Sequence, residues 1–174
     1  MIPREMSKIA KQRAREFPVL TIVGPRQSGK TTLAKSCFPS YGYVNLEDPE
    51  TRELAENDYR RFFAVYKPPL IIDEIQRVPK LASAILPMVD ERRAVLGQYI
   101  LTGSHQPMLK QTVTQSLAGR SAFLELLPLT FGELAQGAGK TKTDPDSLIL
   151  RGTMPELAIS GMEASTYYRN YLNS

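Results

Sequence analysis

Short apolar runs alternate with longer mixed stretches over most of this chain. Five runs read as buried strands, namely Val19–Val23, Tyr43–Leu46, Leu70–Ile72, Tyr99–Leu101 and Phe123–Leu126. The stretches between them predict helices near Gly29–Ser36, Pro49–Tyr66, Lys80–Arg92 and Gln106–Leu117. Strands that alternate with helices are typical of an α/β fold whose sheet is mainly parallel, and five strands suit a small doubly wound core.

The pattern changes after the fifth strand. Thr130-Phe131-Gly132-Glu133 has the spacing of a capping box, which predicts a short helix ending near Gly137. Residues 139–145 combine Gly, Lys, Thr, Asp and Pro, a composition typical of a polar linker with turns. Two further short helices are expected near Pro155–Ile159 and Glu163–Leu172.

Composition narrows the class of protein. A chain of 174 residues is long enough to bury a core in one domain, so neither a disulfide scaffold nor a structural metal is required. Its single cysteine, Cys37, excludes an internal disulfide and a thiolate cluster, and we interpret it as a small packed hydrophobe. The first residues lack an apolar leader, and no run approaches the roughly 18 apolar residues of a membrane span. We therefore expect a soluble, cytoplasmic protein with no membrane partner.

The net charge of +4 is concentrated at the start of the chain. Residues 1–35 hold eight Lys and Arg against two acids, whereas the remainder carries a net charge of −2. A basic first segment fits either a nucleic-acid contact or a solvated helix face, and the second interpretation is favoured. A nucleic-acid partner therefore stays open but weakly supported.

A nucleotide-binding motif follows the first strand. Residues 24–31 read G-P-R-Q-S-G-K-T, which satisfies the P-loop pattern G-x-x-x-x-G-K-[ST] between an apolar strand and a helix. The backbone N–H groups of such a loop point at phosphates, its lysine bridges the β- and γ-phosphates, and its threonine binds Mg²⁺. The predicted cofactors are therefore ATP and Mg²⁺. The predicted ATP-binding residues are Gly24, Pro25, Arg26, Gln27, Ser28, Gly29, Lys30, Thr31 and Thr32.

Two acidic residues follow the third strand. Leu70–Ile72 leads directly into Asp73 and Glu74, at the edge where open α/β sheets bind ligands. We predict that Asp73 and Thr31 hold Mg²⁺, and that Glu74 and Lys30 are catalytic, with Glu74 polarising the attacking water against the γ-phosphate. By itself, an apolar run followed by Asp-Glu also fits a strand end with solvated acids. The neighbouring P-loop favours the functional interpretation.

Two more residues are candidates for catalysis. In P-loop ATPases with an additional central strand, the end of that strand offers a polar side chain to the attacking water, which makes Ser104 the candidate and Thr102 the second choice. The competing interpretation is a turn that caps the next helix. Arg120, on the loop before the fifth strand, is placed to neutralise a γ-phosphate of its own or of an adjacent subunit, or else lies on the surface without a role. The adjacent-subunit alternative implies a homo-oligomer, which the sequence leaves open.

These motifs together resemble one family, the AAA-like prokaryotic P-loop ATPases whose phosphate loop reads G-P-R-Q-x-G-K-T. The matching segments are residues 24–33, 71–76 with Pro79, 101–104, 116–120, 127–134, and Gly152 with 154–156. The resemblance implies an AAA+-like P-loop NTPase three-layer sandwich, with a mainly parallel five-stranded sheet of order 5-1-4-3-2 and short C-terminal helices. It also implies an ATPase core at residues 1–135, and a linker and short helical segment at 136–174 that leads into a further, uncharacterised C-terminal region.

The implied activity is hydrolysis of Mg·ATP to ADP and phosphate, in an AAA+-like switch or motor that acts on an unidentified target. A small P-loop kinase is the enzymatic alternative, but Glu74 directly after Asp73 suits water activation. A GTPase is disfavoured because no N-K-x-D follows any predicted strand. The non-enzymatic alternative is a nucleotide-gated regulator that binds DNA or protein and hydrolyses ATP slowly.

Overall fold

The computed structural model describes residues 2–104, 111, 113, 115–137 and 145–173. In this part of the chain five parallel strands form one sheet, in the order β2-β3-β4-β1-β5. The strands are β1 (Val19–Gly24), β2 (Gly42–Asn45), β3 (Leu70–Asp73), β4 (Tyr99–Ser104) and β5 (Ser121–Glu125). This order, taken from the other edge, is the expected 5-1-4-3-2, and it confirms the P-loop NTPase fold.

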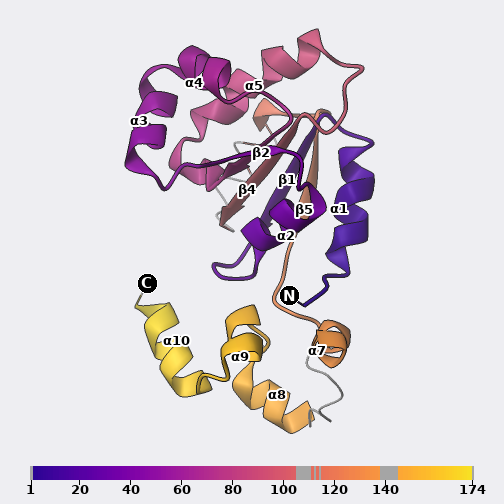
Figure 1. Cartoon of the computed structure of the whole chain (residues 1–174), viewed down its shortest axis with the longest axis vertical. Helices are drawn as coiled ribbons and strands as arrows, with labels where there is room; N and C mark the ends of the chain where they lie inside the picture. The colour runs from indigo at the N-terminus through magenta and orange to yellow at the C-terminus, as the bar shows by residue number, and fades with distance from the viewer. Residues whose placement is uncertain (1, 105–110, 112, 114, 138–144, 174) are drawn as a thin grey trace.

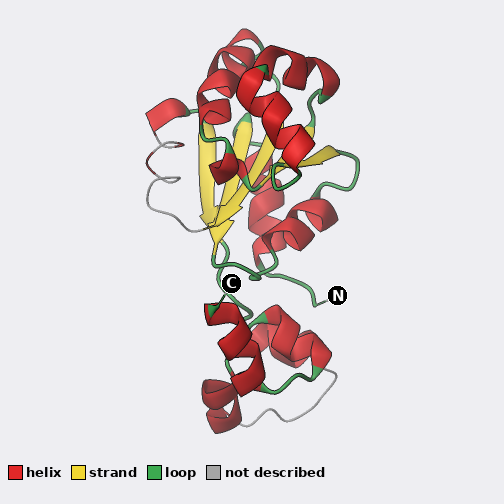
Figure 2. Ribbon diagram, turned by 90° about the vertical axis from the view of Figure 1, so that its left-hand side faces the viewer, coloured by secondary structure: helices red, strands yellow, loops and turns green. Residues whose placement is uncertain are grey.

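Helices cover both faces of this sheet. The covering helices are α1 (Met6–Ala14), α2 (Lys30–Cys37), α3 (Pro49–Asn57), α4 (Tyr59–Val65) and α5 (Lys80–Glu91). α1 and α2 pack on one face, whereas α3, α4 and α5 pack on the other, which gives the three predicted layers (Figures 1 and 2). A short 3-10 helix, η1 (Ile75–Arg77), follows β3.

A group of short helices follows the sheet and lies below it in Figure 1. These helices are α7 (Phe131–Gly137), α8 (Pro145–Arg151), α9 (Pro155–Ser160) and α10 (Ala164–Leu172). They confirm the expectation of short C-terminal helices. None of the described helices has the length and apolar content needed to cross a membrane.

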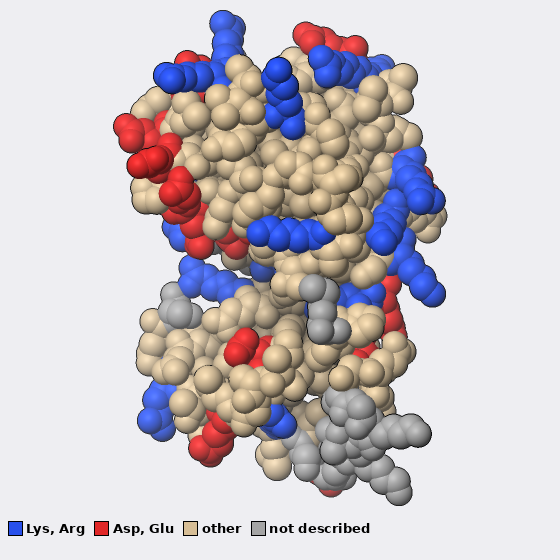
Figure 3. All heavy atoms as spheres, viewed as in Figure 1, with Lys and Arg blue, Asp and Glu red and all other residues tan. Residues whose placement is uncertain are grey.

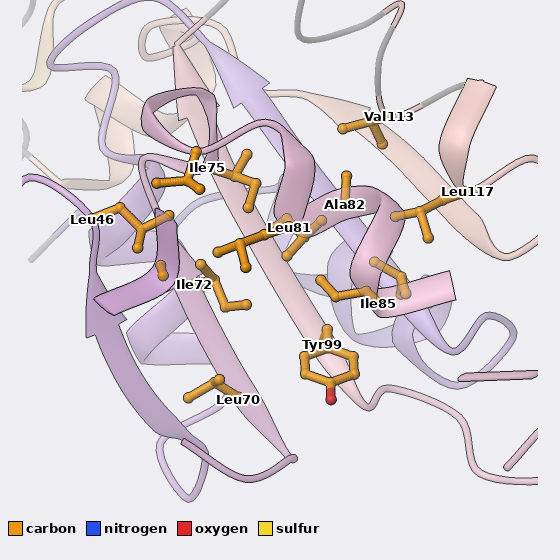
Figure 4. Close-up of a cluster of buried hydrophobic side chains, with 14 of the residues drawn as sticks. Leu46, Leu70, Ile72, Ile75, Leu81, Ala82, Ile85, Tyr99, Val113 and Leu117 are labelled. Carbon is orange, nitrogen blue, oxygen red and sulfur yellow. The ribbon is translucent and has the colours of Figure 1, made fainter. Parts of the chain in front are cut away.

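Strand β1, which lies inside the sheet between β4 and β5, is buried along its whole length because helices cover both sides of the sheet. Val19 and Val23 join the cluster beneath α3, α4 and α5, while Leu20 and Ile22 pack against α1 and α2. This division follows from the two-residue period of a strand, which sends successive side chains to opposite faces. Figure 4 shows the larger cluster, with Tyr99 among the side chains between α5 and the sheet.

The helices depart from the sequence prediction at two points. The stretch predicted as one helix over Pro49–Tyr66 forms α3 and α4 instead, because the Asp58 side chain accepts a hydrogen bond from the Arg61 backbone N–H (2.9 Å) and caps a second helix. α8 is a helix that the sequence analysis does not predict, and it begins at Pro145, a residue favoured at a first helical position. The helix predicted at Gln106–Leu117 lies largely outside the described residues.

The parallel strands bring their carboxyl ends to one edge of the sheet. Gly24 of β1 pairs with Ser104 of β4, and Asn45 of β2 pairs with Asp73 of β3. Because β4 lies between β1 and β3, the carboxyl ends of these three strands meet at this edge. Open α/β sheets bind their ligands at such an edge.

Arg4 ties the start of the chain to two other segments. Its guanidinium donates to the carbonyl oxygen of Ser28 (2.8 Å), to that of Leu127 (2.6 Å), and to Oε1 of Glu133 (3.0 Å). One side chain therefore joins the loop after β1 to the segment between β5 and α7. Because Arg presents several donors in a rigid fork, it can satisfy all three acceptors at once.

Glu133 is the acidic partner in this contact and is only 2% exposed. Its carboxylate accepts from the backbone N–H groups of Thr130 (2.9 Å) and Glu5 (2.8 Å), and the Thr130 hydroxyl accepts from the Glu133 N–H (3.1 Å). The two contacts between Thr130 and Glu133 form the predicted capping box. Burial favours a raised pKa for Glu133, but the backbone hydrogen bonds and Arg4 outweigh it and hold the pKa below its ordinary value.

We predict that Glu133→Gln lowers the free energy of unfolding by about 1–3 kcal/mol at neutral pH, the scale of losing a buried charge-assisted hydrogen bond. Since the pKa of Glu133 is lowered in the folded chain, its stabilisation is complete above the unfolded-state pKa of about 4.3 and is lost as the pH falls through the folded-state pKa. Urea denaturation between pH 7 and pH 3 measures both effects, with the exposed Glu53→Gln as control. A stability difference from wild type that stays constant down to pH 3 would contradict this role.

Candidate functional site

The loop between β1 and α2 is tightly curled. A Cβ atom at Gly24 would lie 2.1 Å from the carbonyl oxygen of Leu126, so only glycine fits there. Gln27 (φ 59°) and Gly29 (φ 91°) adopt left-handed backbone angles just before α2 begins. Ser28 Oγ is buried and has no hydrogen-bond partner among the described residues. This loop has the shape in which backbone N–H groups face an anion at the start of a helix.

Lys30 is the first residue of α2 and is 5% exposed. Its Nζ donates to the carbonyl oxygens of Gly24 (3.1 Å) and Pro25 (2.7 Å), so the amine is held by the loop itself. Burial lowers the pKa of Lys30, whereas the nearby carboxylates of Glu74 and Asp73 raise it. The predicted catalytic lysine is therefore held by the loop and lies near enough to both predicted acids for their charges to act on it.

Asp73 ends β3 and is 3% exposed. Thr31 Oγ1 and Tyr43 Oη both donate to its Oδ2 at 2.8 Å, and Thr102 Oγ1 donates to its Oδ1. These hydroxyls come from α2, β2 and β4, so one carboxylate joins three elements at the sheet edge. Hydrogen bonds of this kind offset the cost of burying a charged group. Burial and the bond to Asp73 raise the pKa of Tyr43, which keeps its hydroxyl protonated as a donor.

Glu74 follows Asp73 with a left-handed backbone (φ 58°, ψ 45°), a conformation that non-glycine residues rarely adopt. Its partly exposed carboxylate accepts a hydrogen bond from the side-chain amide of Gln76. The turn separates the two acids: Asp73 is buried and bonded to three hydroxyls, whereas Glu74 lines an open hollow. The two carboxylates therefore have different surroundings, as two different chemical roles require.

A hollow of about 830 Å³ lies between the loop and α9. Gln27, Lys30 and Thr31 line one side, and Glu74 and residues 155–156 of α9 also contribute to the wall. Its volume is within the range of about 300–1,000 Å³ typical of ligand pockets. Figure 3 shows one face of the molecule, with basic side chains beside the narrowing between the sheet-bearing part and the C-terminal helices.

The structure brings Ser104 to the same edge as the phosphate loop. Ser104 is 9% exposed and pairs with Gly24 across the β1–β4 ladder. Thr102, the second choice from sequence, is fully buried and donates to Asp73. Both residues therefore lie close to the phosphate loop or to Asp73, and the catalytic role of Ser104 stays a prediction.

Arg120 lies at the amino ends of the strands, whereas the phosphate loop follows a carboxyl end. It directly precedes Ser121, which pairs with Val19 at the amino end of β1, whereas the loop follows the carboxyl end of the same strand. The length of β1 puts about 17 Å between these two levels. The guanidinium of Arg120 donates to Asp90 (2.9 Å) and lowers the pKa of that carboxyl. The described structure therefore does not bring Arg120 to its own phosphate loop, and the role of Arg120 stays a prediction.

Several side chains that shape the site lie outside the motifs recognised in the sequence. Arg77, three residues after Glu74, also lines the hollow and forms an ion pair with Glu47 (3.3 Å). Tyr43 reaches Asp73 from a neighbouring strand, and Tyr167 of α10 reaches the phosphate loop. Alternation along β2 hints at the side of the sheet that Tyr43 faces, but the partner of Tyr167 lies far away in the sequence.

The residues present suit a magnesium-bound triphosphate. The Thr31 hydroxyl and the Asp73 carboxylate are hard oxygen ligands of the kind that Mg²⁺ takes, and they lie side by side, with 2.8 Å between Oγ1 and Oδ2. The curled loop supplies backbone donors, and the buried Ser28 hydroxyl adds a polar group that lacks a partner among the described residues. The donor set therefore fits both the metal and the phosphates.

Comparison with known proteins finds relatives in sequence and solved structures of similar fold. Two uncharacterized proteins, one from Mycobacterium bovis and one from Mycobacterium tuberculosis, are each 33% identical to this chain over 146 residues. The alignment covers 79% of this chain and 30% of each relative, so the chain spans less than a third of the length of these curated proteins. Among solved structures, the Walker-type ATPase of Pyrococcus abyssi is 16% identical and has a TM-score of 0.61 over 98% of this chain and 68% of that one. At this identity the likeness shows the fold.

The sequence profile of the family described as AAA domain matches residues 16–135. This range contains all five described strands, the phosphate loop and the Asp73–Glu74 turn. The chain therefore belongs to the AAA domain family of P-loop ATPases.

Proposed function

We propose that this chain binds Mg·ATP beside the phosphate loop and hydrolyses it to ADP and phosphate. One observation carries the proposal: Lys30, Thr31, Asp73 and Glu74 converge at one edge of the sheet, with Thr31 bonded to Asp73 and with Lys30 close to both acids. A role as a switch or motor on an unidentified target and a cytoplasmic location stay predictions from the sequence.

Each of the four side chains has a distinct task in this proposal. The Lys30 amine exchanges its two carbonyl partners for phosphate oxygens, and Thr31 and Asp73 hold Mg²⁺. When bound, Mg²⁺ neutralises negative charge on the phosphates. Glu74 orients the attacking water and accepts its proton, because its carboxylate borders the open hollow rather than the buried cluster.

The adenine ring fits a second hollow that continues from the first. This hollow has a volume of about 140 Å³ and shares Gly29 and Thr32 with the larger one. Its walls are largely apolar and come from the first residues, from the segment after β5 and from α9, including Ile2, Leu129 and Ile159. An apolar cavity of about 150 Å³ is large enough for an aromatic ring. The base then lies beneath the first residues of the chain.

A slow, regulatory ATPase is the second candidate, and the contact between Gln76 and Glu74 favours it. The amide of Gln76 occupies one carboxylate oxygen of Glu74, which leaves fewer acceptors for a water molecule. The rate of hydrolysis then depends on whether Gln76 keeps this hydrogen bond or leaves the Glu74 oxygen to a water molecule. A steady-state phosphate-release assay, run with and without nucleic acid, separates a rapid ATPase from a slow regulator. Phosphate transfer to an added nucleoside in place of release would identify a kinase.

We predict that Lys30→Ala abolishes tight Mg·ATP binding and phosphate release, because it removes the cation that contacts the β- and γ-phosphates. Binding is measured by calorimetry and folding by circular dichroism. Lys8→Ala on α1, where the side chain is exposed, serves as the control and keeps wild-type values. A folded Lys30→Ala protein with undiminished affinity and turnover would refute the proposed phosphate site.

We predict that Glu74→Gln retains ATP but slows hydrolysis by about 10² or more, because the amide cannot accept the proton of the attacking water. Nucleotide affinity and single-turnover hydrolysis are measured on the same preparation. Loss of binding, with normal hydrolysis per bound ATP, would mean that the roles of Asp73 and Glu74 are reversed.

We predict that Arg120 acts on the nucleotide of an adjacent subunit, since it lies at the end of the strands opposite its own phosphate loop. Arg120→Ala should reduce hydrolysis by about 10³ and leave ATP affinity nearly unchanged. Asp90→Asn breaks the same ion pair but keeps the arginine, so it controls for structural damage.

Mixing the Arg120→Ala and Glu74→Gln variants should then restore part of the activity, because some interfaces combine an intact arginine with an intact glutamate. Wild-type turnover by Arg120→Ala alone would leave Arg120 as a structural surface residue.

A further inference from the structure

A tyrosine of the last helix contacts the phosphate loop directly. The hydroxyl of Tyr167 in α10 donates to the side-chain carbonyl of Gln27 at 2.6 Å. Gln27 lies in the loop, three residues before Lys30, at one of its two left-handed positions. The contact therefore joins the C-terminal helices to the part of the loop whose backbone conformation is most demanding.

Tyr167 is firmly held at its own end. It is 5% exposed and packs with Met154 and Leu157, the other buried members of a small cluster. Its ring meets Tyr168 edge-on at 5.1 Å and stacks on Tyr171 at 5.9 Å between centroids. Because the ring is fixed by packing, the hydroxyl is presented to Gln27 at little further cost in entropy.

The same helices form part of the nucleotide hollows. Pro155 and Ile159 of α9 line both the larger and the smaller hollow. The segment between β5 and α7 is tied to the residues just before α9 by a backbone hydrogen bond from Leu129 N–H to the Thr153 carbonyl (2.9 Å). A shift of α9 and α10 therefore changes the walls of the hollows and the Gln27 contact together.

The Tyr167 hydroxyl remains a donor at neutral pH. Burial is the largest of the influences that raise its pKa, and the neighbouring tyrosines and Glu156 act in the same direction. The contact with Gln27 is therefore a neutral hydrogen bond, which does not compete with phosphates for positive charge. Its effect on the site is geometric, through the position of Gln27.

We propose that Tyr167 is a positioning residue for the phosphate loop, and that through Gln27 it couples the packing of α9 and α10 to nucleotide binding. The inference rests on the proposed binding of a nucleoside di- or triphosphate by this loop. Coupling of this kind is reciprocal. If packing of α9 and α10 against the loop strengthens nucleotide binding by some factor, bound nucleotide strengthens that packing by the same factor.

Two roles for Tyr167 can be distinguished by the part of the side chain that each requires. As a packing residue it needs only its ring, whereas as a positioning residue it needs its hydroxyl. Tyr167→Phe removes the hydroxyl and keeps the ring among Met154 and Leu157. Tyr168→Phe, on the same helix and in the same cluster, removes a hydroxyl that makes no hydrogen bond to the loop in the described part of the chain, and is the matched control.

The experiment measures the affinity and dissociation rate of a fluorescent ADP analogue with Mg²⁺ for the wild-type chain and these variants. Tyr167→Phe should weaken binding about 3- to 10-fold, the scale of one neutral hydrogen bond. Tyr168→Phe should bind as the wild type does. In a double-mutant cycle, Tyr167→Phe should add little to the effect of Gln27→Ala, since both changes remove the same contact.

Hydrogen exchange supplies a second readout that does not depend on affinity alone. Saturating Mg·ADP should slow exchange of the backbone amides at residues 164–172 in the wild type, and should protect them less in Tyr167→Phe. Wild-type binding together with equal affinity and equal protection in Tyr167→Phe would overturn the coupling while leaving the nucleotide site intact. A wild-type chain that binds no Mg·ADP would overturn the proposed function and, with it, this inference.

Discussion

The buried carboxylate of Asp73 is the point on which the geometry of the site depends. A charge at 3% exposure requires hydrogen bonds in place of water, and hydroxyls from Thr31, Tyr43 and Thr102 supply them. Because these donors lie on α2, β2 and β4, the electrostatic requirement of one residue also fixes the start of the phosphate-loop helix against the sheet. The parallel register makes this feasible, since it brings the ends of neighbouring strands to the same level.

The phosphate loop is also held from outside the sheet. Arg4 donates to the carbonyl oxygen of Ser28, and Tyr167 donates to the side chain of Gln27, the residue beside it. These two donors come from near opposite ends of the chain, so segments distant in sequence meet at the loop. Such contacts limit the conformations that the loop can adopt, and thus lower the entropy that is lost when a ligand is bound.

Prediction from sequence succeeded where the signal is local. Buried strands read as apolar runs because helices cover both faces, and the phosphate loop and the Thr130–Glu133 box have fixed spacings. The break at Asp58 was missed because its capping preference competed with a continuous helical pattern. The contacts of Arg4, Tyr43 and Tyr167 join residues that no short motif relates. The position of Arg120 follows from strand register, which the sequence alone does not give.

Backbone strain and side-chain contacts coincide at two residues of the site. Gln27 and Glu74 are the non-glycine residues with positive φ in the described part of the chain, and such a conformation costs roughly 1–2 kcal/mol. Each side chain also takes part in a hydrogen bond, Gln27 with Tyr167 and Glu74 with Gln76. A neutral hydrogen bond such as that of Gln27 contributes about 0.5–1.5 kcal/mol, and one to a charged group such as the Glu74 carboxylate about 1.5–3 kcal/mol, which is enough to offset much of that cost. The two conformations are therefore maintained by neighbouring side chains, so that a change in those contacts alters the phosphate loop or the candidate catalytic acid before it alters the sheet.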